Sequence, residues 1–124
     1  MRLLLDTHVL VWAATGDPKL SSAAVKLIDD DANTLYFSAA SIWELTIKGA
    51  ERTGIIPRVL RKALLEAGYL ELPITAEHGL AVEALPNHHR DPFDRIMVAQ
   101  ALSEGFVLVT HDSTLQAYPH TTIV

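Results

Sequence analysis

Short apolar runs alternate with longer amphipathic stretches along this chain. The runs at 3–5 and 106–109 are continuous and apolar, which is typical of strands buried on both faces of a sheet. Apolar residues spaced by three and four positions predict helices in the intervening stretches. Strands are predicted at 3–5, 35–37, 69–72, 106–109 and 122–124. Helices are predicted at 9–14, from Ser21, at 41–48, at 57–67, from Thr75 to just before Pro86, and at 91–104.

This alternation of strands and helices predicts a parallel sheet covered on both faces, the doubly wound α/β class. The length of 124 residues fits one domain, 1–124. In such sheets ligands bind outside the carboxyl ends of the strands, near the point where the strand order reverses. Residues that directly follow strands are therefore the first candidates for a functional site.

The composition narrows the chemistry that such a site can use. Hydrophobic residues make up 49% of the chain, and no apolar run approaches the roughly 20 residues that cross a bilayer. Asp6 interrupts the N-terminal leucines too early for a signal peptide, so we expect a cytoplasmic protein with no membrane partner. The absence of cysteine excludes disulfides, thiolate metal sites and cysteine nucleophiles. A metal ion would have to bind oxygen or imidazole ligands.

The net charge of −5 argues against a protein that holds nucleic acid by bulk electrostatics alone. The positive charge is unevenly spread, because half of the ten basic residues lie between positions 48 and 62. A solvated helix face is the commoner explanation of such a run, and a basic arm beside a site for a polyanion is the alternative. The residues concerned are Lys48, Arg52, Arg58, Arg61 and Lys62.

Four acidic residues are expected at one edge of the predicted sheet. Asp6 follows the first strand and Asp112 follows the strand at 106–109, so both should lie at the carboxyl edge. Glu44 and Asp94 fall in the first turns of predicted helices that begin near the same edge if the crossovers are right-handed.

Each acid also has a structural explanation. Ser41 and Glu44 fit a capping box, in which the glutamate returns a hydrogen bond to the helix start. Asp91 followed by proline fits an N-cap, and Asp94 would be favoured by the helix dipole. Asp6 and Asp112 could be ordinary turn residues. Taken singly, each acid is more often structural than catalytic.

Taken together, the acids predict a metal site. Converging carboxylates repel one another, and a hard divalent cation with oxygen ligands, Mg²⁺ or Mn²⁺, relieves that repulsion. The histidines are weaker candidates: His8 and His111 adjoin key acids but are more often packed residues, and His88 and His89 lie in a predicted loop. No zinc-protease, nucleophile-elbow or phosphate-loop motif is present.

In this setting the motifs resemble those of the PIN-domain ribonucleases, and most closely the VapC-like toxins of toxin–antitoxin pairs. The resemblance spans essentially the whole length. It is carried, in the family's order, by Leu3–Thr7, Ser41–Leu45, Asp91–Ala101 and Val109–Asp112.

The resemblance implies a three-layer sandwich around a short parallel sheet, often assembled as a homodimer. It implies a metal-dependent endoribonuclease whose RNA cleavage a cognate antitoxin blocks. Two parts of the pattern differ: His111 replaces the small polar residue common in relatives, and Asp91 adds a fifth acid that we assign to the helix cap. The implied site holds Mg²⁺ or Mn²⁺ on four acids, Asp6, Glu44, Asp94 and Asp112. Three further residues support these acids: Thr7, Thr110 and Asp91. Weaker candidates for contacts with the substrate are Lys48, Arg52, Arg95 and His111.

The predicted chemistry is metal-assisted hydrolysis of a phosphodiester, with two ions about 4 Å apart if both are bound. Asp6 and Asp94 are the first choices for direct ligands, and Glu44 and Asp112 for contacts through water. PIN domains that process RNA outside a toxin pair are an alternative. A haloacid-dehalogenase-like phosphohydrolase is a weaker one, because its second acid would stand where this chain has His8. A non-catalytic interaction protein of the same fold is also disfavoured, because four converging acids repel one another and a protein that only binds a partner gains nothing from them.

Overall fold

The sheet is parallel throughout, with the strand order β3-β2-β1-β4-β5. A computed structural model describes residues 1–87 and 91–124; the predicted loop residues His88 and His89 lie outside this range. The strands are β1 (Arg2–Leu5), β2 (Thr34–Ser38), β3 (Leu70–Leu72), β4 (Val107–Thr110) and β5 (Thr121–Ile123). The helices are α1 (Thr7–Thr15), α2 (Ser22–Asp29), α3 (Ala39–Lys48), α4 (Ala50–Thr53), α5 (Pro57–Glu66), α6 (Ala76–Glu83), α7 (Pro92–Glu104) and the 3-10 helix η1 (Ser113–Ala117).

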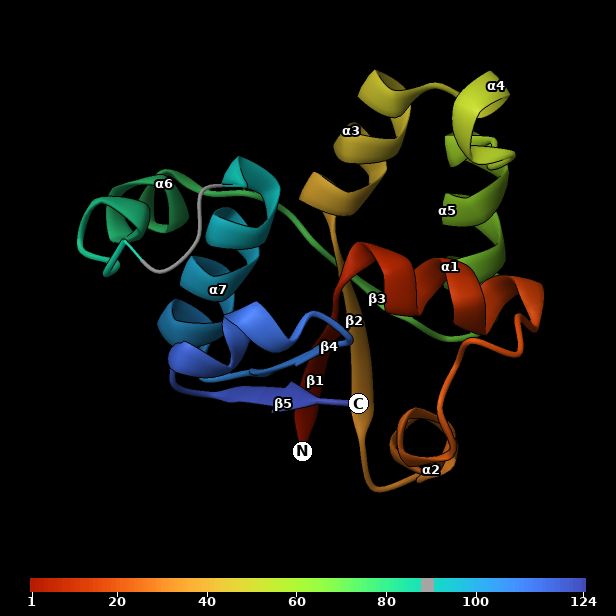
Figure 1. Cartoon of the computed structure of the whole chain (residues 1–124), viewed down its shortest axis with the longest axis horizontal. Coiled ribbons are helices and arrows are strands. Elements are labelled where there is room, and N and C mark those ends of the chain that lie inside the picture. The colour runs from red at the N-terminus through yellow and green to blue at the C-terminus, as the bar shows by residue number, and fades with distance from the viewer. Residues whose placement is uncertain (88–90) are drawn as a thin grey trace.

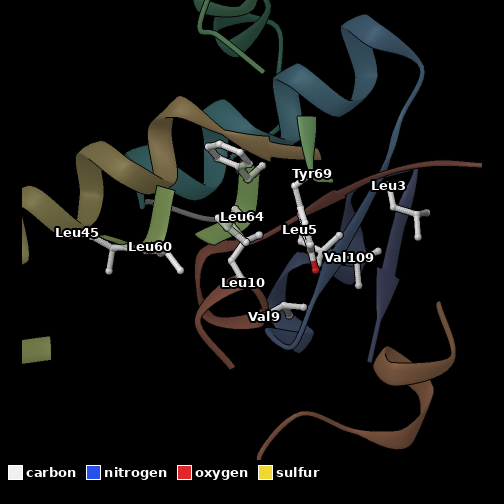
Figure 2. Packing of buried hydrophobic residues seen from close by; sticks show 10 residues of the cluster. Leu3, Leu5, Val9, Leu10, Leu45, Leu60, Leu64, Tyr69 and Val109 are labelled. Atoms are coloured by element: carbon white, nitrogen blue, oxygen red, sulfur yellow. The ribbon is translucent and has the colours of Figure 1, made fainter. Parts of the chain in front are cut away.

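The central strand β1 explains why the sheet has helices on both sides. Leu3, Leu4 and Leu5 are all buried, and successive side chains of a strand point to opposite faces. Leu3 and Leu5 pack into one core with residues of α1 and α5, as Figure 2 shows, whereas Leu4 packs into a second core with residues of α7. The predicted three-layer α/β architecture is thus confirmed.

The two helical layers lie on opposite sides of the sheet (Figure 1). Helices α1, α2 and α5 lie on one side, and α6, α7 and η1 lie on the other. Helix α3 continues directly from β2 and contributes Leu45 to the first core and Ala40 to the second. It therefore stands at the boundary between the two layers, above the strand ends.

Strand order reverses between β1 and β4. From β1 the chain adds β2 and β3 on one side, and it then crosses to place β4 and β5 on the other. Figure 1 shows α1 and α3 starting where β1 and β2 end, with α7 beginning towards the same edge of the sheet. The carboxyl ends of β1 and β4 therefore flank the position at which open α/β sheets bind ligands.

Candidate active site

Asp6 lies at the carboxyl end of β1 and begins α1. Its Oδ1 atom accepts a hydrogen bond from the Val9 backbone N–H at 3.0 Å, which makes Asp6 the N-cap of that helix. Its Oδ2 atom accepts a hydrogen bond from the Thr110 hydroxyl at the end of β4. Asp6 is only 4% exposed. The carboxylate therefore joins the two central strands at the switch point.

Thr110 also connects this carboxylate to Asp112. The Thr110 Oγ1 atom accepts a hydrogen bond from the Asp112 backbone N–H at 3.0 Å. The Asp112 side chain caps η1, because its Oδ1 atom accepts from the Thr114 N–H at 2.9 Å and from the Thr114 hydroxyl at 2.6 Å. A hydroxyl at the end of β4 thus fixes the relative positions of two acids that are distant in sequence.

Glu44 lies inside α3 and reaches the same edge from the neighbouring strand. Its Oε1 atom accepts a hydrogen bond from the Thr7 hydroxyl at 2.7 Å, and its Oε2 atom pairs with Lys48 at 2.6 Å. The capping-box explanation is wrong, because Ser38 caps α3 and Ser41 lies within the helix. Glu44 is only 4% exposed and accepts side-chain hydrogen bonds rather than a bond from the helix start.

The charges of these residues act on one another. Burial raises the pKa of Asp6 above its ordinary value, and the negative charge of Glu44 raises it further. The hydrogen bonds from Thr110 and Val9 and the charge of His8 lower the pKa of Asp6 without cancelling the rise. Asp6 and Glu44 are thus close enough to repel each other, as expected for carboxylates that share a site.

The remaining acids lie at the start of α7. Asp91 is the N-cap, as predicted, because its carboxylate accepts from the backbone N–H groups of Phe93 at 2.8 Å and Asp94 at 3.2 Å. Asp94 occupies the first turn of α7. In residues 1–87 and 91–124, no three histidine, aspartate or glutamate side chains lie together closely enough to hold a metal ion. Thr110 connects Asp6 with Asp112 by hydrogen bonds, whereas Glu44 belongs to a separate network with Thr7 and Lys48. Asp94 lies on a helix that begins at the same edge (Figure 1).

Arg95, predicted as a substrate contact, makes hydrogen bonds within the protein. Its guanidinium donates hydrogen bonds to the backbone carbonyls of Val82 at 3.2 Å and Pro86 at 3.1 Å, and to the Tyr118 hydroxyl at 3.3 Å. These contacts tie α7 to the end of α6. A contact between Arg95 and substrate stays a prediction.

The predicted basic arm divides into two parts. On α5, Arg61 pairs with Glu71 at 2.7 Å, which raises the pKa of Arg61, and Lys62 lies 3.9 Å from Glu66. These side chains form the solvated helix face that was the commoner explanation. Lys48 and Arg52 instead line a groove next to Thr7. The positive charge near the acids is therefore limited to the second part.

Sequence reasoning missed Trp12. The Trp12 ring stacks on His8, with ring centroids 5.8 Å apart, and meets the edge of His111 at 5.1 Å. His8 and Trp12 are four positions apart, and this spacing places them on the same face of α1. The four-residue spacing was therefore the sequence feature from which this ring pair could have been predicted.

Comparison with known proteins places the chain in a family. Residues 3–120 match the family model of the PIN domain, so the chain belongs to the PIN-domain family. Over 121 residues it is 33% identical to Ribonuclease VapC22 of Mycobacterium tuberculosis, covering 95% of this chain and 92% of that protein.

Solved structures agree on the fold. VapBC2 of Rickettsia felis, bound to a DNA fragment from its promoter, matches with a TM-score of 0.71 at 16% identity, covering 100% of this chain and 98% of that one. VapC20 of Mycobacterium tuberculosis, a sarcin-ricin loop cleaving toxin, matches with a TM-score of 0.63 at 21% identity, covering 94% and 95%. At these identities the likeness extends to the fold alone. Within the described ranges, no helix is both long and apolar enough to cross a membrane.

Proposed function

We propose that this chain is an endoribonuclease that hydrolyses RNA phosphodiester bonds with the help of Mg²⁺ or Mn²⁺. The observation that carries the proposal is the buried pair of carboxylates, Asp6 and Glu44, which hydroxyls from Thr110 and Thr7 orient at the switch point of a PIN-domain sheet. The ribonuclease activity named for the relative that is 33% identical supports the choice of RNA as substrate.

The residues present fit a hard divalent cation. The side chains that hydrogen-bond Asp6 and the Oε1 atom of Glu44 offer hydroxyl oxygens. Burial and, to a smaller extent, the charge of Glu44 raise the pKa of Asp6, and a cation would stabilise the ionised carboxylate that both disfavour. Mg²⁺ commonly binds proteins through one or two carboxylates and keeps several waters, so a preformed cage of three acids is not required. The chemistry that such an ion supplies is a lowered pKa of bound water and neutralisation of phosphate charge.

The chain's own acidic and hydroxyl side chains would hold the cation and position the reacting groups. Asp6 and Asp94 would hold the cation, and Glu44 and Asp112 would bind it through water or orient the attacking water. Thr110 and Thr7 fix the carboxylates of Asp6 and Glu44 in single orientations by hydrogen bonding. Lys48 neutralises one Glu44 oxygen and would limit the repulsion of an approaching phosphate.

Cleavage of labelled RNA tests this proposal. We expect activity with Mn²⁺ or Mg²⁺, none with EDTA, and products with 5′-phosphate ends, because water rather than the ribose 2′-hydroxyl attacks. Glu44→Gln should lower the rate by about 10–100-fold, as for residues that act on a metal through a water. Glu66→Gln is the matched control, since Glu66 is 68% exposed on α5. Cyclic 2′,3′-phosphate ends, or full activity in EDTA, would contradict the proposed mechanism.

We further propose that the enzyme is the toxin of a toxin–antitoxin pair, acting in the cytoplasm as a homodimer. Solved complexes of the same fold support an antitoxin partner, including VapBC of Salmonella typhimurium bound to DNA and a toxin–antitoxin complex from Klebsiella pneumoniae. An arginine of the antitoxin would pair with the acidic site.

Expression in cells tests the toxin assignment. The chain alone should arrest growth, and co-expression with a small protein encoded next to it should restore growth. Glu44→Gln expressed alone is the control for a burden that does not depend on catalysis. Wild-type chain that cleaves RNA yet leaves growth unchanged would indicate a PIN-domain RNA-processing nuclease instead.

A further inference from the structure

A groove of about 360 Å³ lies directly beside the candidate active site. Thr7 and Lys48 both line the groove and both contact the Glu44 carboxylate, so the groove lies next to that acid. Three cations line it, Lys19 from the connection between α1 and α2, Lys48 from α3 and Arg52 from α4, against the single acid Asp17. Although the whole chain is acidic, this surface is positively charged.

The three cations differ in whether they already form an ion pair. Lys48 pairs with Glu44 at 2.6 Å. Within residues 1–87 and 91–124, neither Lys19 nor Arg52 has an acidic partner within 4.0 Å. Both cations can therefore contact an anionic ligand without first breaking an ion pair.

The groove also has an aromatic wall. His8 and Trp12 both line it, with their rings stacked at an interplanar angle of 19°. His111 packs its ring against Trp12 from outside the groove and is itself held by a 2.9 Å hydrogen bond that its Nδ1–H donates to the Val124 carbonyl. The Trp12 ring is thus fixed by contacts on two sides, while His8 is exposed to solvent. A rigid, partly exposed ring pair is suited to stacking on a flat ligand.

Cations that follow a backbone, combined with rings on which bases stack, are how proteins bind single-stranded nucleic acid. We infer that this groove binds an unpaired nucleotide of RNA next to the scissile bond, with its base stacked on the His8–Trp12 pair and its phosphates near Lys19 and Arg52. The inference rests on the proposed ribonuclease function and deepens it, because a base can stack in this groove only if it is unpaired. The site would therefore select unpaired segments over duplexes.

Tryptophan fluorescence can test the stacking directly, since the chain has only two tryptophans, Trp12 and Trp43. In Trp43→Phe, Trp12 is the single reporter, and Trp12→Phe leaves Trp43 as the matched control. Titration in EDTA at low salt, where the proposed cleavage is off, uses a single-stranded oligoribonucleotide and a duplex of the same sequence. We expect the single strand to quench Trp12 to saturation and the duplex to quench it little, with Trp43 changing less in both titrations.

Affinity provides the second measurement. Trp12→Leu keeps an apolar side chain but removes the ring, and we expect it to bind the single strand about 5–100-fold more weakly, whereas Trp12→Phe should stay within a few-fold of wild type. Melting temperatures of both variants exclude misfolding as the cause. Equal quenching by duplex and single strand, an absence of quenching, or equal affinities of Trp12→Leu and wild type would each overturn the inference.

The outcomes also separate the inference from the proposed function. Quenching by the single strand without cleavage in Mn²⁺ would uphold the groove and refute the nuclease. Cleavage in Mn²⁺ that is unaffected by Trp12→Leu would uphold the nuclease and refute the groove. Binding of the partner protein but not RNA at Trp12 would assign the groove to the partner, and would overturn the inference as well.

Discussion

At Asp6, one side chain serves both the fold and the proposed chemistry. Its two oxygens accept hydrogen bonds from Val9 and Thr110, yet burial and the charge of Glu44 raise its pKa. A carboxylate has about four lone-pair sites, so these two bonds leave capacity for a cation. Structural and functional explanations of this acid are therefore not exclusive.

The raised pKa gives a prediction for stability without metal. Because the folded pKa of Asp6 exceeds the ordinary value of 3.8, the folded state holds this proton more tightly than the unfolded chain. The contribution of Asp6 to stability is thus fully present below 3.8 and is lost as pH rises through the folded pKa. In EDTA, we expect Asp6→Asn to be neutral or stabilising at neutral pH and to lose that advantage in acid. Urea unfolding across pH measures this.

Metal should reverse this order of stability, so that the wild type becomes more stable than Asp6→Asn. A site at about 100 times its dissociation constant adds about 2.7 kcal/mol to the wild type, and Asp6→Asn should lose most of that gain. Ser21→Ala is the control, since loss of the N-cap of α2 costs about 0.5–2 kcal/mol with or without metal. The prediction is contradicted if Mn²⁺ does not raise the melting temperature of the wild type and Asp6→Asn is less stable than the wild type in EDTA. Asp6 would then act only as a helix cap.

At the scale of elements, the sequence predicts regular segments well where a hydrophobic pattern is long enough to read. The continuous apolar run at 3–5 and the capped, proline-initiated helix at 92–104 appear within about a residue of expectation. Helices α4 and η1 were missed, because they are too short to show a hydrophobic period. Likewise, α1 begins at Thr7 rather than Val9, since Asp6 is its cap.

The start of α3 shows why local motifs mislead. Ser38 and Ser41 both precede short helical stretches, and the glutamate three residues after Ser41 favoured the later start. In the fold, the Ser41 hydroxyl instead forms a 2.9 Å hydrogen bond with the Thr7 hydroxyl, which also binds Glu44. These partners are more than 30 positions away in sequence. Such tertiary contacts override a cap signal, and no local pattern reveals them.

Gln100 provides a test of this long-range coupling. It is fully buried on α7, accepts a 2.6 Å hydrogen bond from the Ser38 hydroxyl, and donates at 3.3 Å to the Pro73 carbonyl. Gln100→Ala leaves the buried Ser38 hydroxyl without an acceptor and removes the bond to Pro73, so we expect a loss of about 1–3 kcal/mol in the free energy of unfolding. Gln116→Ala, the same change at an exposed position of η1, should stay within about 0.5 kcal/mol. Equal effects of the two changes would show that the buried network contributes little.

At the scale of the whole molecule, the fold explains how a chain with a net negative charge can bind an anionic substrate. The net charge is −5, but the cations around the groove are separated from Arg61 and Lys62 of α5, which have acidic neighbours. The sequence alone could not make this distinction, because positions 48–62 form one continuous basic segment. Only packing shows that Lys48 and Arg52 lie beside the site while Arg61 and Lys62 face acids on their own surface.

Salt dependence of RNA binding measures how many of these charges act on the substrate. For single strands, the logarithm of affinity falls with the logarithm of salt concentration with a slope of about −0.7 per phosphate neutralised. Contacts from the three groove cations Lys19, Lys48 and Arg52 would give a slope of about −2. A protein using its entire basic segment would show a steeper dependence.

Single substitutions locate those charges. Arg52→Gln should weaken binding of a single-stranded oligoribonucleotide in EDTA and make the slope shallower by about 0.7. Lys62→Gln removes the same charge from a side chain that is 79% exposed on α5, and we expect its slope to equal that of the wild type. Anisotropy titrations over a range of salt concentrations give both slopes. If Lys62→Gln flattens the dependence as much as Arg52→Gln, RNA follows α5 as well, and the basic arm, which the sequence left as the alternative to a solvated helix face, is correct in full.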